Sequence, residues 1–267
     1  MRASFSQRHL VTVSSVQAQF LGRPRAEPFS PCKELPISIS SVPVVPARAG
    51  RARRRVPPGA PMLRIPLREW FRATPFIFMH LACLAVFWVE VTPTALILCA
   101  VAYFLRMFGL TAGYHRYFSH RTFKTSRWFQ FVLAWLGCSA VQKGPLWWAG
   151  HHRTHHLYSD TEEDVHSPHT TSFLWSHLGW IIGDQHTETN YRAMRDMSRY
   201  PELRWLNRNH VVPGIVLAVT CFLIGGWPGL VWGFFVGTVI LYHATFTINS
   251  LCHIFGTRRY PTNDLVS

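Results

Sequence analysis

Four of the six residues from 151 to 156 are histidines, in the order H-H-R-T-H-H. Imidazole is the commonest metal ligand among protein side chains. On a helix, His152, His155 and His156 are related as i, i+3 and i+4, so their rings project from one face. The spacing therefore predicts a metal site on a helix.

Two further clusters could deliver ligands to the same metal site. His115 and His120 are spaced i, i+5, about 140° apart on an ideal α-helix, which is a weak signal alone. Asn249 and His253 are spaced i, i+4 and share one helical face.

Six imidazoles are more than one tetrahedral zinc ion takes and indicate two metals in one pocket. Imidazoles suit iron and, unlike thiolates, survive an oxidant. The remaining histidines of the middle and end of the chain are expected to be non-ligands by default, with His151 able to reach the site or to support it from outside. They are His151, His166, His169, His177, His186, His210 and His243.

Four apolar segments, 75–91, 94–112, 211–225 and 230–246, form two pairs, and each pair is joined by a short connection without Lys or Arg. A helix that spans a membrane needs about 20 mostly apolar residues. The longer flanking segments carry the Lys and Arg residues, which places them in the cytoplasm by the positive-inside rule.

The predicted fold is therefore an all-α integral membrane protein with four transmembrane helices in two hairpins and a cytoplasmic, helical, histidine-rich cap. The expected location is a bacterial inner membrane or the endoplasmic reticulum. The apolar segment 128–141 is too short to span and is predicted to be an interfacial helix. A soluble helical bundle is the alternative.

Residues 1–61 differ from the rest in composition. They hold nine Arg, one Lys and nine Pro but only two acids, Glu27 and Glu34, so their net charge is +8. This composition predicts a disordered tail before a membrane domain at 62–267. The tail resembles an organelle transit peptide, and an alternative is that Met62 is the true start.

The whole chain is basic, with a net charge of +14, and 48% of its residues are hydrophobic. The apolar segments favour a lipid membrane over nucleic acid as the partner of this charge. Its six cysteines form no C-x-x-C pair, so neither a disulfide framework nor a thiolate zinc site is indicated.

Three histidine boxes can be read in the sequence: H-x4-H at 115–120 (the first box), H-x-x-H-H at 152–156 (the second box) and N-x3-H at 249–253 (the third box). This pattern between two membrane hairpins resembles the integral-membrane fatty-acyl desaturases, most closely the acyl-CoA Δ9 (stearoyl-CoA) type. The similarity runs from about residue 72 to 260. It extends to GLTAGY at 109–114, QKGPLWW at 142–148, YSDTEEDVHSP at 158–168 and HATF at 243–246.

The resemblance implies a di-iron centre that uses O2 to place a cis double bond in a saturated fatty acyl-CoA, for unsaturated fatty acid biosynthesis. Electrons would come from cytochrome b5 or a ferredoxin with its reductase. The implied iron ligands are His115, His120, His152, His155, His156 and His253, with Asn249 acting through water. Gln142 and Trp148 would lie beside the acyl tunnel, and Arg153 near the CoA headgroup.

The family pattern has one more box, H-N-x-H-H, after the position of His253, and this sequence holds no such box. His166-Ser167-Pro168-His169 does not replace it, because a proline interrupts it. The expectation is that three ligands are absent and that this polypeptide as given binds iron poorly and lacks desaturase activity.

Two other functions stay open. A membrane di-iron hydroxylase has similar boxes. A non-catalytic remnant, or a histidine-lined metal or proton transporter, belongs to another class, although transporters place such groups near mid-membrane rather than at one surface.

Overall fold

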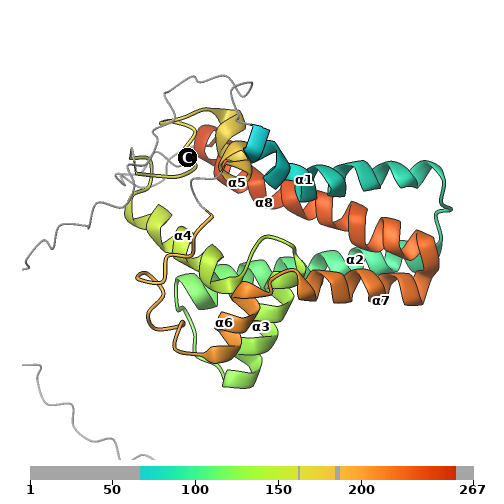
Figure 1. Ribbon diagram of the computed structural model, residues 1–267, viewed down its shortest axis with the longest axis horizontal. Coiled ribbons are helices and arrows are strands. Elements are labelled where there is room, and N and C mark those ends of the chain that lie inside the picture. The colour runs from blue at the N-terminus through green and yellow to red at the C-terminus, as the bar shows by residue number, and fades with distance from the viewer. Residues whose placement is uncertain (1–66, 162, 184–186, 257–267) are drawn as a thin grey trace, which may run out of the picture. The chain divides into compact units, whose positions relative to one another are not determined.

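The computed structural model describes residues 67–161, 163–183 and 187–256, and all regular secondary structure within them is helical. The predicted tail 1–61 lies outside the described residues. Helix α1 (Leu67–Ala82) runs into the 3-10 helix η2 (Cys83–Phe87), and α2 (Pro93–Phe108) follows. The hydroxyl of Thr92 accepts a hydrogen bond from the backbone N–H of Ala95, which caps α2. The chain reverses its direction between η2 and α2 (Figure 1).

A second reversal joins α7 (Val212–Pro228) to η6 (Gly229–Val236) and α8 (Gly237–Ile254). The turn is at Gly226, whose φ of 59° is the left-handed conformation that glycine adopts most readily. A Cβ on Gly229 would lie 2.3 Å from the carbonyl oxygen of Cys221, so only glycine lets η6 approach α7 this closely. The two arms of this hairpin therefore pack backbone to backbone.

Two segments of the described residues, Pro93–Ser119 and Val212–Ile254, are long and apolar enough to cross a membrane. The apolar helix Ala73–Phe87 is shorter. Large apolar side chains on these helices and in the turn after η2 face outward, among them Leu223 and Trp88, which are 76% and 80% exposed. Apolar surface of this extent is typical of a lipid or protein contact.

One charged side chain, Arg106, is buried among these helices. Its guanidinium donates to the carbonyl of Ala102, the hydroxyl of Thr238 and the carbonyl of Gly233. A buried charge is tolerated where its donors are satisfied, so Arg106 fastens α2 to η6 and α8.

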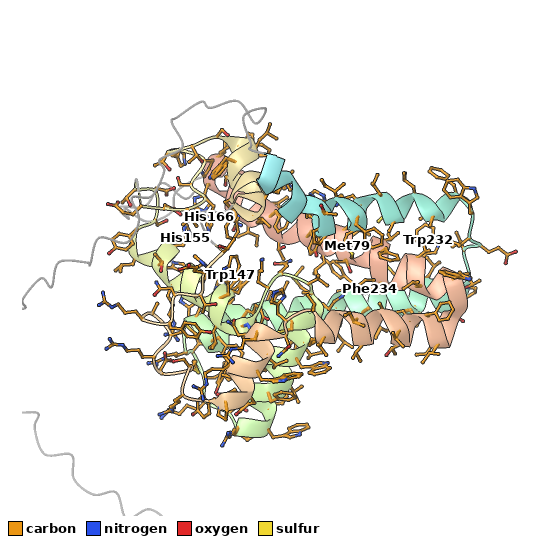
Figure 2. The ribbon with its side chains drawn as sticks, in the orientation of Figure 1. Met79, Trp147, His155, His166, Trp232 and Phe234 are labelled. Carbon is orange, nitrogen blue, oxygen red and sulfur yellow. The ribbon has the colours of Figure 1, made fainter. Side chains whose placement is uncertain are left out.

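The remaining helices gather at the other end of the long hairpins (Figure 1). They are η3 (Gly109–Ser119), α3 (Arg127–Ser139), α4 (Pro145–Leu157), η4 (Trp175–Gly179), α5 (Trp180–Ile182) and α6 (Pro201–Arg208). Figure 2 shows Trp147, His155 and His166 in this part, whereas Met79, Trp232 and Phe234 lie among the long helices.

Two glycines set the packing of η3 on α3. A Cβ on Gly109 would lie 2.6 Å from backbone atoms of α3, and a Cβ on Gly137 would lie 2.1 Å from the Tyr114 ring. Tyr114 is fully buried and its hydroxyl is bonded to the sulfur of Cys138 and the carbonyl of Lys143. This contact ties η3, α3 and the loop before α4 into one unit.

Candidate metal centre

Helix α4 carries the cluster at residues 151–156, as its spacing predicts. Pro145 occupies the first turn, where its missing N–H costs nothing, and the helix continues to Leu157. His152 and His156 lie one turn apart, with 3.0 Å between their Nε2 atoms. His155 points to another part of the site and is buried.

The segment before α3 is not an ordinary α-helix. Residues Gly109–Ser119 form a π-helix, and the N–H of His120 bonds the carbonyl of His115 at 3.1 Å. In such a helix, residues i and i+5 lie about one turn apart. The rings of His115 and His120 are therefore only 4.5 Å apart, whereas an ideal α-helix would separate them by about 140°.

Four imidazoles converge between η3 and α4, namely those of His115, His120, His152 and His156. The ring centre of His115 lies 4.7 Å from that of His152, and the ring centre of His120 lies 4.6 Å from that of His156. The Nε2 atom of His152 is 3.3 Å from Nε2 of His120.

This arrangement fits a metal ion. Burial, together with the neighbouring histidines, lowers the pKa of His152 to about 2, so its ring is neutral. Its one Nε2 atom faces two other Nε2 atoms at 3.0 and 3.3 Å, and a single proton cannot satisfy all three. Two nitrogens at right angles on one metal, with bonds of about 2.1 Å, are about 3.0 Å apart.

A second group adjoins the first, with the ring centre of His155 5.4 Å from that of His156 and 6.1 Å from that of His152. The ring centre of His155 is 5.6 Å from that of His253 in α8. Nδ1 of His155 bonds the carboxylate of Asp164 at 2.9 Å, and Nδ1 of His253 lies 3.4 Å from the carboxylate of Asp160. Both contacts turn the Nε2 lone pair of the histidine away from the carboxylate, which is the usual support for a metal-bound imidazole.

Asp164 is buried as an anion. Burial raises its pKa, but hydrogen bonds from His155 and from the backbone N–H of Asp160 help to outweigh this, so the pKa lies below its ordinary value. The backbone N–H of His166 also donates to this carboxylate. The acidic stretch after the second box therefore supports the histidines and is not simply a solvated loop.

His166 belongs to this second group, although the sequence predicts it to be a non-ligand. Its ring centre is 4.2 Å from that of His155, and its buried Nδ1 has no hydrogen-bond partner among the described residues. Burial and the neighbouring His155 lower its pKa to about 3. The signal that could have found it is the D-x-H spacing of Asp164 and His166.

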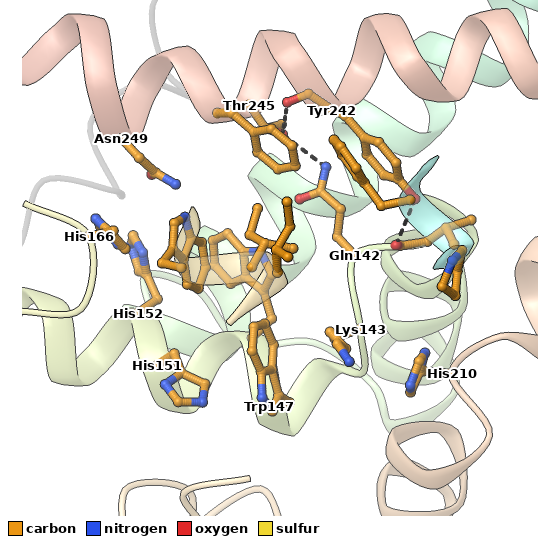
Figure 3. A pocket seen from close by; sticks show the side chains of 18 of the residues that line it. Gln142, Lys143, Trp147, His151, His152, His166, His210, Tyr242, Thr245 and Asn249 are labelled. Carbon is orange, nitrogen blue, oxygen red and sulfur yellow. Dashed lines mark hydrogen bonds between the residues drawn. The ribbon is translucent and has the colours of Figure 1, made fainter. Parts of the chain in front are cut away.

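A cavity of about 230 Å³ leads to these histidines. Asn249, His152 and His166 line one end of it (Figure 3). Gln142 and Trp148, the two residues predicted to lie beside an acyl chain, also line it. Aromatic and aliphatic side chains make up most of the remaining wall, which suits an alkyl chain.

Arg153 does not line this cavity. Its five N–H groups are all used inside the protein: they donate to the carbonyls of Phe118, Ser119 and Ala193 and to both carboxylate oxygens of Asp196. No donor is left for a substrate headgroup. Arg153 therefore joins α4 to the end of η3, and its predicted place near a CoA headgroup stays a prediction.

A third histidine array, outside the boxes, links α1, η4 and α8. Nε2 of His243 lies 3.1 Å from Nε2 of His80, and Nδ1 of His243 lies 3.1 Å from Nε2 of His177. His177 also bonds the hydroxyl of Ser250 at 2.9 Å. These rings form a chain and do not converge on one point, so they fit hydrogen bonding between helices better than a metal ion.

Residues 88–266 match the family model described as fatty acid desaturase. An sn-1 stearoyl-lipid 9-desaturase of Anabaena variabilis is 34% identical over 206 residues, which cover 74% of each chain. A chloroplastic palmitoyl-monogalactosyldiacylglycerol delta-7 desaturase of Arabidopsis thaliana is 35% identical over 60% of this chain and 43% of its own. An acyl-CoA 5-desaturase of Anemone leveillei is 33% identical over 70% of this chain and 59% of its own.

The family match takes in the histidine groups of η3, α4 and α8 and the Gln142 and Trp148 positions of the cavity. The chain belongs to the fatty acid desaturase family.

Proposed function

We propose that this protein is a di-iron oxidoreductase that places a cis double bond in a saturated fatty acyl chain. His115, His120, His152 and His156 would hold one iron. His155 and His253, with Asn249 beside them, would hold the other, and His166 would be an additional donor there. The observation that carries this proposal is the convergence of three Nε2 atoms at 3.0 and 3.3 Å.

The reaction consumes one O2, two electrons and two protons for each double bond and releases two waters. The iron pair, when bound, would supply the oxidising power that unactivated methylenes require. The residues of this chain position the reactants: Asp164 and Asp160 orient the histidines, while the apolar cavity holds the alkyl chain and excludes water.

The finer assignment is a Δ9 double bond, with electrons from cytochrome b5 or a ferredoxin. The relative from Anabaena variabilis supports the position, because its name states a 9-desaturase acting on a lipid-linked stearoyl chain. An acyl-CoA substrate, expected from the sequence, has support from the Anemone leveillei relative. The use of all five Arg153 donors inside the protein weighs against CoA recognition by this residue.

We propose further that all four long helical arms span a membrane, with the histidine-bearing part on the cytoplasmic side. Two segments of sufficient length and hydropathy, and exposed side chains such as Trp88 and Leu223, support the membrane placement. The basic residues around the histidine groups support the sidedness.

The test combines metal content with product analysis. In an iron or cobalt(II) titration of the purified protein, saturation near two ions per chain would show that the histidine groups described above suffice, whereas weak metal binding would match the expectation from the sequence that three ligands are absent. Expression in a desaturase-deficient host with a redox partner should give cis-monoenoic fatty acids by gas chromatography and mass spectrometry. Hydroxylated chains as the sole product would instead support the hydroxylase alternative, and two-metal binding with no oxidised lipid would contradict the proposed activity.

A further inference from the structure

The loop between α3 and α4 holds an unusual backbone conformation. Val141 and Lys143 have φ values of 58° and 71°, in the left-handed region that β-branched and long side chains avoid. Two tyrosine hydroxyls hold the loop in place: Tyr242 donates to the carbonyl of Val141 and Tyr114 to that of Lys143, both at 3.0 Å. Strain maintained by surrounding contacts is a feature of functional sites.

The strained loop directs two polar side chains to the cavity. Gln142 lies inside it and donates to the hydroxyl of Thr245 at 2.9 Å (Figure 3). Lys143 also lines the cavity, and its ammonium lies 5.9 Å from the ring centre of Trp147. The loop therefore fixes a cation at the cavity wall.

A second nitrogen donor lies beside Lys143. His210 lines the same cavity, and its buried Nδ1 has no hydrogen-bond partner among the described residues. Burial and the positive charge of Lys143 lower the pKa of His210. Figure 3 shows both at the end of the cavity away from His166 and Asn249.

These two groups lie where the long helices begin. His210 stands between α6 and α7, and α7 starts the apolar segment at Val212. Helix α6 is amphipathic, with Arg204 and Trp205 exposed. Tryptophan and basic residues beside an apolar helix are typical of the headgroup level of a bilayer. An anion at Lys143 and His210 would thus lie at the depth of lipid phosphates.

We propose that Lys143 and His210 bind the phosphate of a membrane glycerophospholipid whose acyl chain occupies the cavity and reaches the histidine groups. This inference rests on the proposed function. Acyl-CoA offers phosphate as well, but the position at the start of α7 favours a substrate that stays in the bilayer. A fixed headgroup would determine which methylene reaches the metal centre, because the double bond is counted from the carboxyl end.

The test is lipid binding by the full chain in nanodiscs. The probe is a phosphatidylglycerol with a diazirine in its sn-1 acyl chain, and its apparent Kd is read from the labelled fraction. Competitors are stearoyl-CoA, inorganic phosphate and diacylglycerol, which lacks the phosphate. The variants are Lys143→Asn, Lys143→Arg and His210→Gln, and the control is Lys124→Asn, which removes an exposed lysine.

Lys143→Asn and His210→Gln should each weaken phosphatidylglycerol binding about tenfold, the factor expected for one charge-assisted hydrogen bond. Lys143→Arg and Lys124→Asn should bind as the unaltered protein does. Because asparagine tolerates the left-handed conformation better than lysine, Lys143→Asn should leave Tm unchanged or higher. An unchanged or higher Tm would show that Lys143→Asn loses lipid binding without losing its fold.

Three results would overturn the inference: unchanged binding in both weakened variants, equal labelling by diacylglycerol and phosphatidylglycerol probes, or Lys143-dependent binding of stearoyl-CoA alone. The proposed function fails separately. Fatty acid products formed with unchanged phosphatidylglycerol binding in the variants would refute only the headgroup site, and variant-sensitive binding without any oxidised product would refute only the desaturase.

Discussion

Replacement of Arg153 by methionine should both destabilise the protein and weaken its metal site. Arg153 connects α4 to the carbonyls of Phe118 and Ser119, the residues just before His120. The Asp196 carboxylate accepts hydrogen bonds from both Arg153 and Arg121. One carboxylate therefore connects α4, which carries the second box, to the residue that follows His120. Methionine keeps most of the volume but removes every donor.

The magnitude follows from burial. Removing one partner of a buried ion pair costs about 3–5 kcal/mol, because the other charge is left uncompensated. The side chains of Arg153 and Asp196 are 19% and 21% exposed, and Asp196 keeps its contact with Arg121, so its charge is partly compensated and the lower figure, about 3 kcal/mol, applies. For a protein of this size that loss lowers Tm by about 6–12 °C. An Arg153→Lys variant would retain the charge but at most three donors, at a cost of about 1–2 kcal/mol.

The assay is thermal unfolding of the metal-free protein, followed by cobalt(II) titration monitored by absorption. We expect cobalt(II) affinity to fall about 10- to 100-fold in Arg153→Met, the range seen when groups that orient metal ligands are removed. The control is Arg127→Met, which breaks a two-point contact with Glu202 on the surface and should change neither quantity appreciably. A Tm loss in Arg153→Met no greater than in the control, or normal cobalt(II) affinity, would refute the reasoning.

Three further outcomes are expected. Asp164→Asn should lower metal affinity about 10- to 100-fold, measured by the same titration, because the carboxylate that orients His155 is lost; unchanged affinity would contradict this. Burial raises the pKa of Asp196, but its partners Arg153 and Arg121 lower it by more, so the net pKa is depressed. The stabilising contribution of Asp196 is therefore present above about pH 4 and is lost as the pH falls below that value. Tm measured against pH should show this loss, and Asp196→Asn should abolish it. Gly137→Ala should destabilise by about 1–3 kcal/mol in thermal unfolding, since the new methyl would lie 2.1 Å from the buried Tyr114 ring; a neutral effect would show that the ring can move.

Spacing within one helix could be predicted from the sequence because it depends only on helical geometry. The i, i+3, i+4 relation of the second box predicted convergent rings on α4, and His152 and His156 do converge, with their Nε2 atoms 3.0 Å apart. The apolar segments likewise predicted a helical protein, which the described residues are.

The first box shows where local reasoning failed. On an ideal α-helix, His115 and His120 diverge, and the prediction treated them as a weak pair. The π-helical turn of η3 brings their ring centres to 4.5 Å. That turn depends on contacts with distant residues, such as the donation from Arg153 to the carbonyls at its end. The helix propensity of residues 109–119 alone therefore does not predict this π-helical turn.

The sequence by itself determined which residue types were present for metal chemistry, which helix presents the second box, and the resemblance to the desaturases that the family match confirms. Only the tertiary structure decided that Asp164 supports His155, that His166 is buried beside it, and that Arg153 has no donor left for a substrate. The physical reason is that burial and hydrogen-bond partners are set by segments distant along the chain, whereas periodicity reports only one helix at a time.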